Sequence, residues 1–409
     1  MQSRDLVDIL DPRYGERNLK ALLALVGVAA VSVRTTPAVS QTPSRLAVVL
    51  DGVMRETGSQ GIAAAIVQGG QVVEVEARGR RNASGTELTP DTVMYGASLT
   101  KAAFAYMVLQ LVDEERIDLD RSIADYLPHP LTEYGSDEIE ERYARYSDLA
   151  GDERWRALTP RILLNHSSGF ANFGFLEPDG KLRFHFDPGS RYAYSGDGIM
   201  LLQFVLEEGL GLDVGVEMQR RVFDRFGMTR TSMSWRPDFA ANVADGWTEE
   251  GDPQPHDQRS KTRAAGSMDT TISDMARLAA GLSRGEGLST AMQAERIRPQ
   301  LPITTRSQFP TLQEELPVER RRADLVAALG VVTFTGPQGP GWFKSGRDDI
   351  TGNTWVCLER VQKCVAVMSN DVRSERGFAR IVYAALGDTG MPWTWEYGFE
   401  MLQNDATAQ

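Results

Sequence analysis

The sequence predicts an α/β fold plus a helical domain, in which an antiparallel sheet flanked by helices is interrupted by a mainly α-helical insertion. Strand-like apolar patterns lie near both ends of the chain, whereas the middle is helical and rich in loops. The length of 409 residues allows two or three lobes that share a large core. We therefore expect a sheet domain over residues 41–97 and 265–409, split by a mainly helical domain over residues 98–264.

The first part of the sheet is predicted by a hairpin pattern. Residues 43–56 show amphipathic helical spacing, and two apolar runs, 61–67 and 72–75, follow on either side of Gly69-Gly70. Two apolar runs joined by a pair of glycines are typical of a β-hairpin. We expect a helix and then a hairpin at this end of the chain.

The remaining elements follow from helix signals in the middle and strand signals towards the C-terminus. Residues 98–114 show helical spacing, and Thr159-Pro160 has the N-cap and first-turn proline of another helix start. The acidic stretch 136–141 is expected to be a solvated surface segment. Strand patterns return at residues 326–334, 342–345, 354–358 and 364–368, before a helical run at 374–386. We expect one sheet to combine the strands from both chain ends.

The first 40 residues carry features of an export signal. An uncharged apolar stretch over residues 21–33 follows Arg17 and Lys20 and precedes the small residues Ala38-Val39-Ser40, as in a secretory signal peptide. The stretch is too short to span a bilayer. Acidic residues before it do not fit a signal peptide, so a later start, an uncleaved anchor and a buried N-terminal helix are alternatives. We expect residues 1–40 to be an export signal or membrane anchor and the protein to be periplasmic or secreted, with a cytoplasmic location as the alternative.

Composition and charge exclude several classes of function. The chain has 44 Lys and Arg against 56 Asp and Glu, a net charge of −12 that repels nucleic acids and anionic membrane surfaces. It has two cysteines and four scattered histidines, without a C-x-x-C or H-E-x-x-H motif. We therefore expect no metal site and no nucleic-acid partner, and the chemistry must come from hydroxyls, lysines and carboxylates.

A candidate nucleophile, in Ser98-Leu99-Thr100-Lys101, stands at the start of the predicted helix over residues 98–114. At this spacing the serine and the lysine share one helical face, where a neutral amine can take the proton of the hydroxyl. The helix N-terminus also favours a developing oxyanion. The motif alone is weak, because a capping serine followed by a surface lysine has the same pattern.

Two further motifs follow in the required order: Tyr192-Ala193-Tyr194-Ser195-Gly196-Asp197, and Trp342-Phe343-Lys344-Ser345-Gly346 on a predicted strand. With the first motif they resemble the serine β-lactamase and penicillin-binding protein superfamily, specifically its class C β-lactamase-like branch of esterases and D-amino-acid peptidases. Asn165-His166-Ser167-Ser168-Gly169 and Ala265-Gly266-Ser267-Met268 are also similar to that branch. The resemblance runs from about residue 45 to residue 385 and implies a β-lactamase/transpeptidase-like fold.

The resemblance implies a role for each catalytic residue. It makes Ser98 the acylated nucleophile, Lys101 its proton partner, and Tyr194 a shuttle that brings a proton to the leaving group or activates water. We expect the ammonium groups of Lys101 and Lys344 to lower the pKa of the Tyr194 phenol. The alternative for Tyr194 is a packed aromatic side chain with a satisfied hydroxyl.

The third motif is expected to bind substrate and to help stabilise the oxyanion. The resemblance places Lys344, Ser345 and Gly346 on an edge strand facing the cleft, where the lysine and serine would bind a substrate carboxylate. A solvent-facing strand end is the alternative. The resemblance also assigns the oxyanion hole to the backbone N–H groups of Ser98 and Arg347.

One position departs from the pattern of the superfamily. Families that act on β-lactams commonly carry asparagine two residues after the motif tyrosine, where this chain has Gly196. We expect this difference to weaken β-lactam turnover and to leave the nucleophile untouched. Asp197 and the run Arg347-Asp348-Asp349 are candidates to replace the missing contact, with solvated loop charges as the alternative.

The two cysteines, Cys357 and Cys364, lie in two consecutive predicted strands. A turn centred between Arg360 and Val361 places them opposite each other, and facing residues of an antiparallel pair are within disulfide range. We expect a disulfide in an exported protein, and two buried free thiols if the protein is cytosolic.

These observations lead to an expected function. We expect a serine hydrolase without a cofactor that acts through an acyl-enzyme on a small ester, amide or β-lactam, with a cell-wall peptide as a further candidate partner. Lys344 and Ser345 favour carboxylate-bearing amides such as D-amino-acid peptides or β-lactams, whereas Gly196 favours a plain ester. The alternative is a non-catalytic ligand sensor or envelope scaffold with the same fold. We make no prediction of the oligomeric state.

Overall fold

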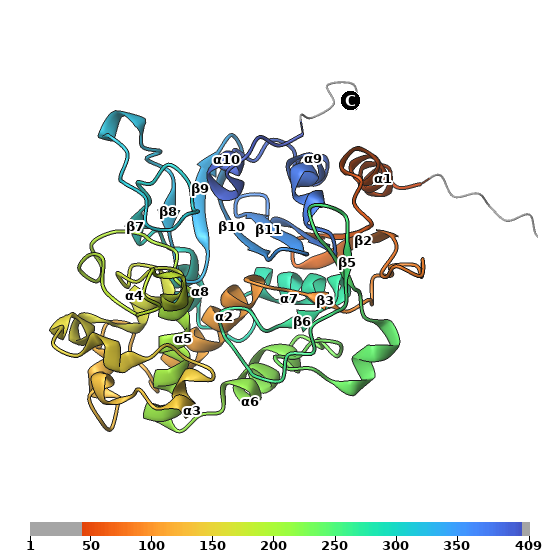
Figure 1. Ribbon diagram of the computed structural model, residues 1–409. Helices are drawn as coiled ribbons and strands as arrows, with labels where there is room; N and C mark the ends of the chain where they lie inside the picture. Colours follow the sequence, from red (N-terminus) through yellow and green to blue (C-terminus); the bar gives the residue numbers. More distant parts are fainter. Residues whose placement is uncertain (1–42, 403–409) are drawn as a thin grey trace, which may run out of the picture. The chain divides into compact units, whose positions relative to one another are not determined.

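An eight-stranded antiparallel sheet forms the centre of the computed structural model, which describes residues 43–402. Its strand order, β2-β1-β12-β11-β10-β9-β8-β7, combines strands from both chain ends (Figure 1). The strands are β1 (Gly61–Gln68), β2 (Gln71–Gly79), β7 (Leu301–Pro302), β8 (Val326–Ala327), β9 (Val332–Gly336), β10 (Gly339–Arg347), β11 (Gly352–Leu358) and β12 (Lys363–Ser369). The predicted antiparallel sheet flanked by helices is therefore confirmed.

Helices cover both faces of this sheet. Helices α1 (Arg45–Thr57) and α9 (Phe378–Leu386) pack on one face and α7 (Ile272–Ser283) packs on the other. Along β1, Ala63 and Ala65 join the core on the α7 side. Their neighbours Ile62, Ala64 and Ile66 join the core under α1. Successive side chains of a strand point to opposite faces, so a strand covered on both sides is apolar throughout.

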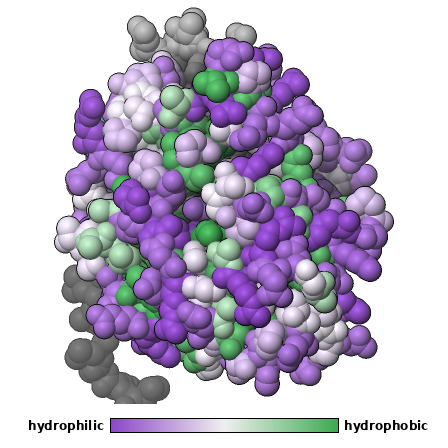
Figure 2. All heavy atoms as spheres, turned by 90° about the vertical axis from the view of Figure 1, so that its left-hand side faces the viewer, coloured by the Kyte–Doolittle hydropathy of each residue, from purple (hydrophilic) through white to green (hydrophobic). Residues whose placement is uncertain are grey.

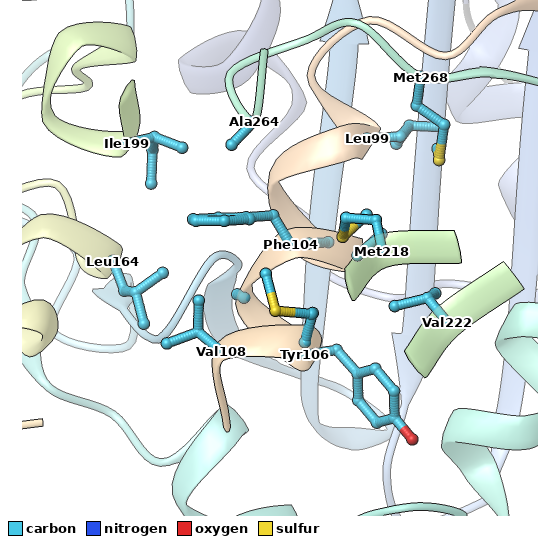
Figure 3. Packing of buried hydrophobic residues seen from close by; sticks show 14 of the residues in the cluster. Leu99, Phe104, Tyr106, Val108, Leu164, Ile199, Met218, Val222, Ala264 and Met268 are labelled. Atoms are coloured by element: carbon cyan, nitrogen blue, oxygen red, sulfur yellow. The ribbon is translucent and has the colours of Figure 1, made fainter. Parts of the chain in front are cut away.

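Helix α2 (Leu99–Asp113) lies in the middle of the second layer and is buried on every side. Figure 3 shows its side chains Phe104, Tyr106 and Val108 among apolar residues from the surrounding elements: Leu164, Ile199, Met218, Val222, Ala264 and Met268. A helix held on all sides cannot shift or rotate without opening the core. It therefore fixes the residues at its N-terminus.

The remaining helices and short strands complete the fold. The helices are α3 (Asp137–Glu140), α4 (Pro160–Leu164), α5 (Gly196–Phe204), α6 (Val214–Met218), α8 (Thr290–Ile297) and α10 (Trp393–Tyr397). Helices α6 and α8 contact α2 directly. The short strands pair as β3 (Met94–Tyr95) with β6 (Asp269–Thr270) and β4 (Gly246–Trp247) with β5 (Pro253–Gln254). Thr159 caps α4, and its hydroxyl accepts a hydrogen bond from the N–H of Ile162. The α4 start agrees with the Thr159-Pro160 signal.

One predicted strand differs from the structure. The run 326–334 is not one strand, because Gly330 has a φ of 77° and turns the chain between β8 and β9. The apolar pattern continues through this break, so the pattern alone does not locate it. The helical run predicted at 374–386 is present, as the end of a 3₁₀ helix over Val372–Gly377 followed directly by α9.

Cys357 and Cys364 face each other across β11 and β12 and form a disulfide. Their Cα atoms lie 4.1 Å apart. The same register continues along the whole pair, from Gly352 opposite Ser369 to Leu358 opposite Lys363. The disulfide therefore joins two strands that the sheet already holds side by side.

Among residues 43–402, no helix is both long and apolar enough to cross a bilayer. On the face that Figure 2 shows, hydrophilic residues predominate and hydrophobic ones form small scattered groups. The expected signal or anchor over residues 1–40 lies outside the described residues.

Candidate active site

Ser98 and Lys101 lie at the buried N-terminus of α2. The Lys101 Nζ atom lies 3.0 Å from the Ser98 Oγ atom and donates a hydrogen bond of 2.5 Å to the carbonyl oxygen of Ala265. The pairing of β3 with β6 brings Ala265 to this point. Ser98 makes no side-chain cap bond and Lys101 is only 1 % exposed, so the alternative of a capping serine with a surface lysine is wrong.

Tyr194 completes this group from the other side of the nucleophile. Its hydroxyl donates a hydrogen bond of 2.8 Å to Ser98 Oγ, and the Lys101 and Lys344 Nζ atoms lie 4.9 and 5.0 Å from its ring centre. The ring of His166 packs beside it, with 4.4 Å between ring centres, and His166 Nδ1 accepts a hydrogen bond from the Ser195 N–H. The structure thus brings all three predicted catalytic side chains together.

Burial determines the protonation of these groups. It lowers the pKa of Lys101 well below its usual value, and the neighbouring Lys344 lowers it further. Burial also raises the pKa of Tyr194, so the expectation that two ammonium groups would lower it is wrong. Burial thus favours the neutral amine of Lys101, which can accept a proton and supplies no positive charge to the phenol. It also favours the protonated phenol of Tyr194, which can donate one.

The Lys344-Ser345-Gly346 motif lies on β10 against the start of α2. Strand β10 is not an edge strand, because β9 lies beside it. The pairing of β10 with β9 ends at Phe343, so the motif residues themselves pair only with β11. A side chain at Gly346 would have its Cβ atom 2.8 Å from the backbone N of Ser98. This close approach requires glycine and brings the β10 backbone up to the N–H group of Ser98. The family resemblance predicts that this N–H group and that of Arg347 form the oxyanion hole.

Glu396 is a site residue that the sequence analysis missed. It lines the same cavity as Ser98 and Lys344, from helix α10 near the C-terminus. The available signal was a single acidic residue in the aromatic run Trp393-Thr394-Trp395-Glu396-Tyr397. Burial raises its pKa, whereas Lys344 and a hydrogen bond from Ser345 lower it. The lysine of the third motif therefore has a carboxyl group of the protein as its neighbour.

The space beside Gly196 is filled by aromatic and amide side chains that the sequence analysis also missed. A Cβ atom at Gly196 would lie 2.3 Å from Cζ of Phe173. The Gly196 N–H donates a hydrogen bond of 3.0 Å to Oδ1 of Asn172, which lines the cavity. Phe173 stacks on Phe175, with 5.1 Å between ring centres. The region where an asparagine at position 196 would reach is occupied by Phe173.

Asp197 is not a solvated loop charge. It is 7 % exposed, and its Oδ2 atom accepts a hydrogen bond of 2.6 Å from the N–H of Gly174. Burial raises its pKa to about 6, while this hydrogen bond and Arg263 lower it. Asp348 is likewise partly withdrawn from solvent and accepts hydrogen bonds from the N–H groups of Ile350 and Thr351. Both carboxylates hold loops at the rim of the site.

Ser98, Lys101, Tyr194, Lys344 and Glu396 line one cavity of about 820 Å³, open at the surface. It contains the nucleophile, the motif residues of β10, and an apolar wall that includes Phe173, Phe175 and Phe309. Over residues 43–402, no three His, Cys, Asp or Glu side chains gather in a way that could hold a metal ion. The arrangement can activate a hydroxyl for attack on an acyl group held against an apolar wall.

Comparisons with known proteins identify the family and the fold. The family model described as Beta-lactamase matches residues 46–388. A penicillin-binding protein homologue from Pyrococcus abyssi, described as octameric, is 18% identical over 84% of this chain and 77% of its own, with a TM-score of 0.65. The D-alanine carboxypeptidase AmpC from Burkholderia cenocepacia is 16% identical over 84% of this chain and 97% of its own, with a TM-score of 0.63. A class C β-lactamase is 14% identical over 84% of this chain and 94% of its own, with a TM-score of 0.64. At these identities the likeness to solved structures shows the fold alone.

Proposed function

We propose, since this chain belongs to the β-lactamase family, that it is a serine hydrolase which forms an acyl-enzyme on Ser98 and acts best on small esters with an apolar acyl group. The observation that carries the proposal is the contact of Ser98 Oγ with both Lys101 Nζ, at 3.0 Å, and the Tyr194 hydroxyl, at 2.8 Å. Such a group supplies the base and the acid that acyl transfer needs.

Acylation begins with proton transfer from Ser98 to the neutral amine of Lys101. The Ser98 Oγ atom then attacks the ester carbonyl carbon, and the carbonyl π electrons move to the oxygen. The N–H groups of Ser98 and Arg347 would hold this oxyanion, and the N-terminus of α2 adds favourable potential. The Ala265 carbonyl keeps Lys101 Nζ in place, which maintains the geometry of the proton transfer.

Release of the alcohol requires a proton on the leaving oxygen. Tyr194 is suited to donate it, because burial keeps its hydroxyl protonated and its hydroxyl already lies 2.8 Å from Ser98 Oγ. The ammonium formed on Lys101 then returns a proton to Tyr194. In deacylation a water molecule gives a proton to the Lys101–Tyr194 pair while its oxygen bonds to the acyl carbonyl carbon. The bond from that carbon to Ser98 Oγ then breaks, Oγ takes the proton back, and the acid leaves.

The apolar wall supports a preference for apolar acyl groups. Phe173, Phe175 and Phe309 line the cavity, and Phe173 stands where β-lactam-processing families would place an asparagine amide. Each methylene buried there contributes roughly 0.8 kcal/mol, or about a fourfold rise in kcat/KM per carbon until the wall is covered. β-Lactams and D-alanyl amides lack their amide partner at position 196 and should be slower substrates.

The experiment measures hydrolysis of p-nitrophenyl acetate, butyrate and hexanoate, with nitrocefin and a D-alanyl amide for comparison. Ser98→Ala should lower kcat by several orders of magnitude, and Ser84→Ala, at an exposed serine, is the matched control. A fluorophosphonate should add one adduct to the wild-type mass and none to Ser98→Ala. Turnover retained in folded Ser98→Ala would refute the mechanism. A wild-type protein that binds these compounds without turnover would support the ligand sensor instead.

An oxidising compartment fits the disulfide between Cys357 and Cys364. Disulfides persist in exported proteins and are rare in the reducing cytosol. This supports a periplasmic or secreted location, in which small envelope or extracellular esters would be the available substrates. The location is tested by fractionation of the native host with an antibody to the protein.

A further inference from the structure

Lys344 and Glu396 are buried side chains that line the cavity of the nucleophile and, with Gln308, a small pocket next to it. Both line the same space as Ser98, and they are 5 % and 6 % exposed. Lys344 comes from β10 and Glu396 from α10, so strands and C-terminal helix meet at this point. Because both side chains are buried in the lining of one cavity, the lysine and the glutamate together determine the charge that a substrate meets there.

Glu396 is held in position by a chain of buried hydrogen bonds. The Gln308 Nε2 atom donates a hydrogen bond of 2.9 Å to Glu396 Oε2, and Gln308 Oε1 accepts one of 2.8 Å from the Tyr192 hydroxyl. The neighbouring Trp395 is fixed through its indole N–H, which donates to the Thr305 hydroxyl. The glutamate therefore keeps its place in the cavity.

We infer that Glu396 neutralises Lys344 inside the cavity and thereby makes the enzyme select esters that carry no negative charge where they meet Lys344. The inference rests on the proposed ester hydrolysis and names the substrates of that site more narrowly. A lone ammonium at this position would attract a carboxylate of the substrate. With Glu396 beside it, the same carboxylate meets a like charge.

The charged forms of the two side chains compensate each other. A protonated lysine and an ionised carboxyl group together carry no net charge, and the two groups titrate as a pair. Each partner favours the charged form of the other, against the effect of burial. Arg347, at the rim, lies 3.4 Å from a carboxyl oxygen of Glu375.

The experiment compares two aryl acetates of nearly equal shape, 3-carbamoylphenyl acetate and 3-carboxyphenyl acetate. Each kcat/KM is divided by the rate constant for hydroxide hydrolysis of the same ester, which corrects for leaving-group reactivity. Wild type should prefer the neutral ester by roughly tenfold or more, the scale of a charge-assisted contact. Glu396→Gln, which keeps an oxygen for Gln308, should shift the ratio about tenfold towards the anionic ester. Glu400→Gln, the same charge change at an exposed residue four positions on, should leave the ratio unchanged.

The Lys344→Met variant provides a second test, which remains usable if Glu396→Gln fails to fold. It leaves Glu396 without its counter-charge, so the anionic ester should be disfavoured further. A wild-type preference for the anionic ester, or an unchanged ratio in folded Glu396→Gln, would overturn the inference. Failure of the proposed function itself gives a different result. In that case wild type would show no hydrolysis of either ester that is lost in Ser98→Ala.

Discussion

The ring of Phe173 occupies the space that a side chain at position 196 would need. An ideal Cβ atom on Gly196 would lie 2.3 Å from Phe173 Cζ and 2.4 Å from Cε1. The phenylalanine at position 173 therefore requires a glycine at position 196. The absence of the asparagine is accompanied by an aromatic wall, so the site exchanges an amide contact for an apolar one.

This pair predicts a coupled effect on stability. Gly196→Ala should reduce the free energy of unfolding by about 1–3 kcal/mol, because the new methyl group overpacks against Phe173. Phe173→Ala should relieve most of that loss in the double variant, which makes the two changes strongly non-additive. Urea unfolding of the four proteins measures the cycle, with Gly52→Ala, whose Cβ meets nothing closer than 3.8 Å, as a control. Additive effects would show that the two positions do not compete for space.

The close approach of Gly346 to Ser98 predicts a loss of activity without a loss of fold. A methyl group on Gly346 would lie 2.8 Å from the Ser98 N atom and 2.9 Å from the Leu99 N atom. Gly346→Ala should therefore displace the oxyanion donors and lower kcat by about 10²–10³. Kinetics on p-nitrophenyl butyrate, beside circular dichroism spectra, check this. Activity within twofold of wild type would place the oxyanion donors elsewhere.

The buried Lys101 predicts a stability that depends on pH. Burial lowers its pKa in the folded protein, so between that value and about 10.5 the unfolded chain binds more protons and wild-type stability rises with pH. Lys101→Met lacks this linkage. The stability of Lys101→Met relative to wild type should thus be greatest near neutral pH and decrease as pH rises, while activity is lost throughout.

Urea unfolding at several pH values between roughly 7 and 9.5 measures the Lys101 effect. Lys261→Met, at an exposed lysine, is the matched control. A stability difference that stays constant with pH would mean that Lys101 is protonated in the folded protein, and the lysine could not then act as the base.

The facing register of Cys357 and Cys364 predicts the thiol content. Protein isolated from its native compartment should react with no equivalent of a thiol reagent in denaturant, and with two after reduction. Alkylation before lysis prevents oxidation during preparation. Two reactive thiols before reduction would contradict the disulfide and the proposed exported location together.

The sequence by itself determined the motifs, their order and the joining of strands from both chain ends in one antiparallel sheet. Strand and helix patterns depend on local periodicity, and the contact between Ser98 and Lys101 spans a single helical turn, so both can be seen in a linear sequence. The facing of Cys357 and Cys364 also follows from local spacing across one turn. The break at Gly330 was not predicted, because an apolar run gives no sign of where a glycine takes a positive φ.

Only the tertiary structure decided the protonation and the charge of the site. The pKa of Tyr194 was expected to fall and instead rises, because burial depends on the packing of the whole molecule around the phenol. Phe173 and Gly196 are 23 residues apart, and Lys344 and Glu396 are 52 apart, so neither pair has a local signature. Their contacts exist because distant segments converge on the N-terminus of α2, where packing, desolvation and charge depend on neighbours in space rather than in sequence.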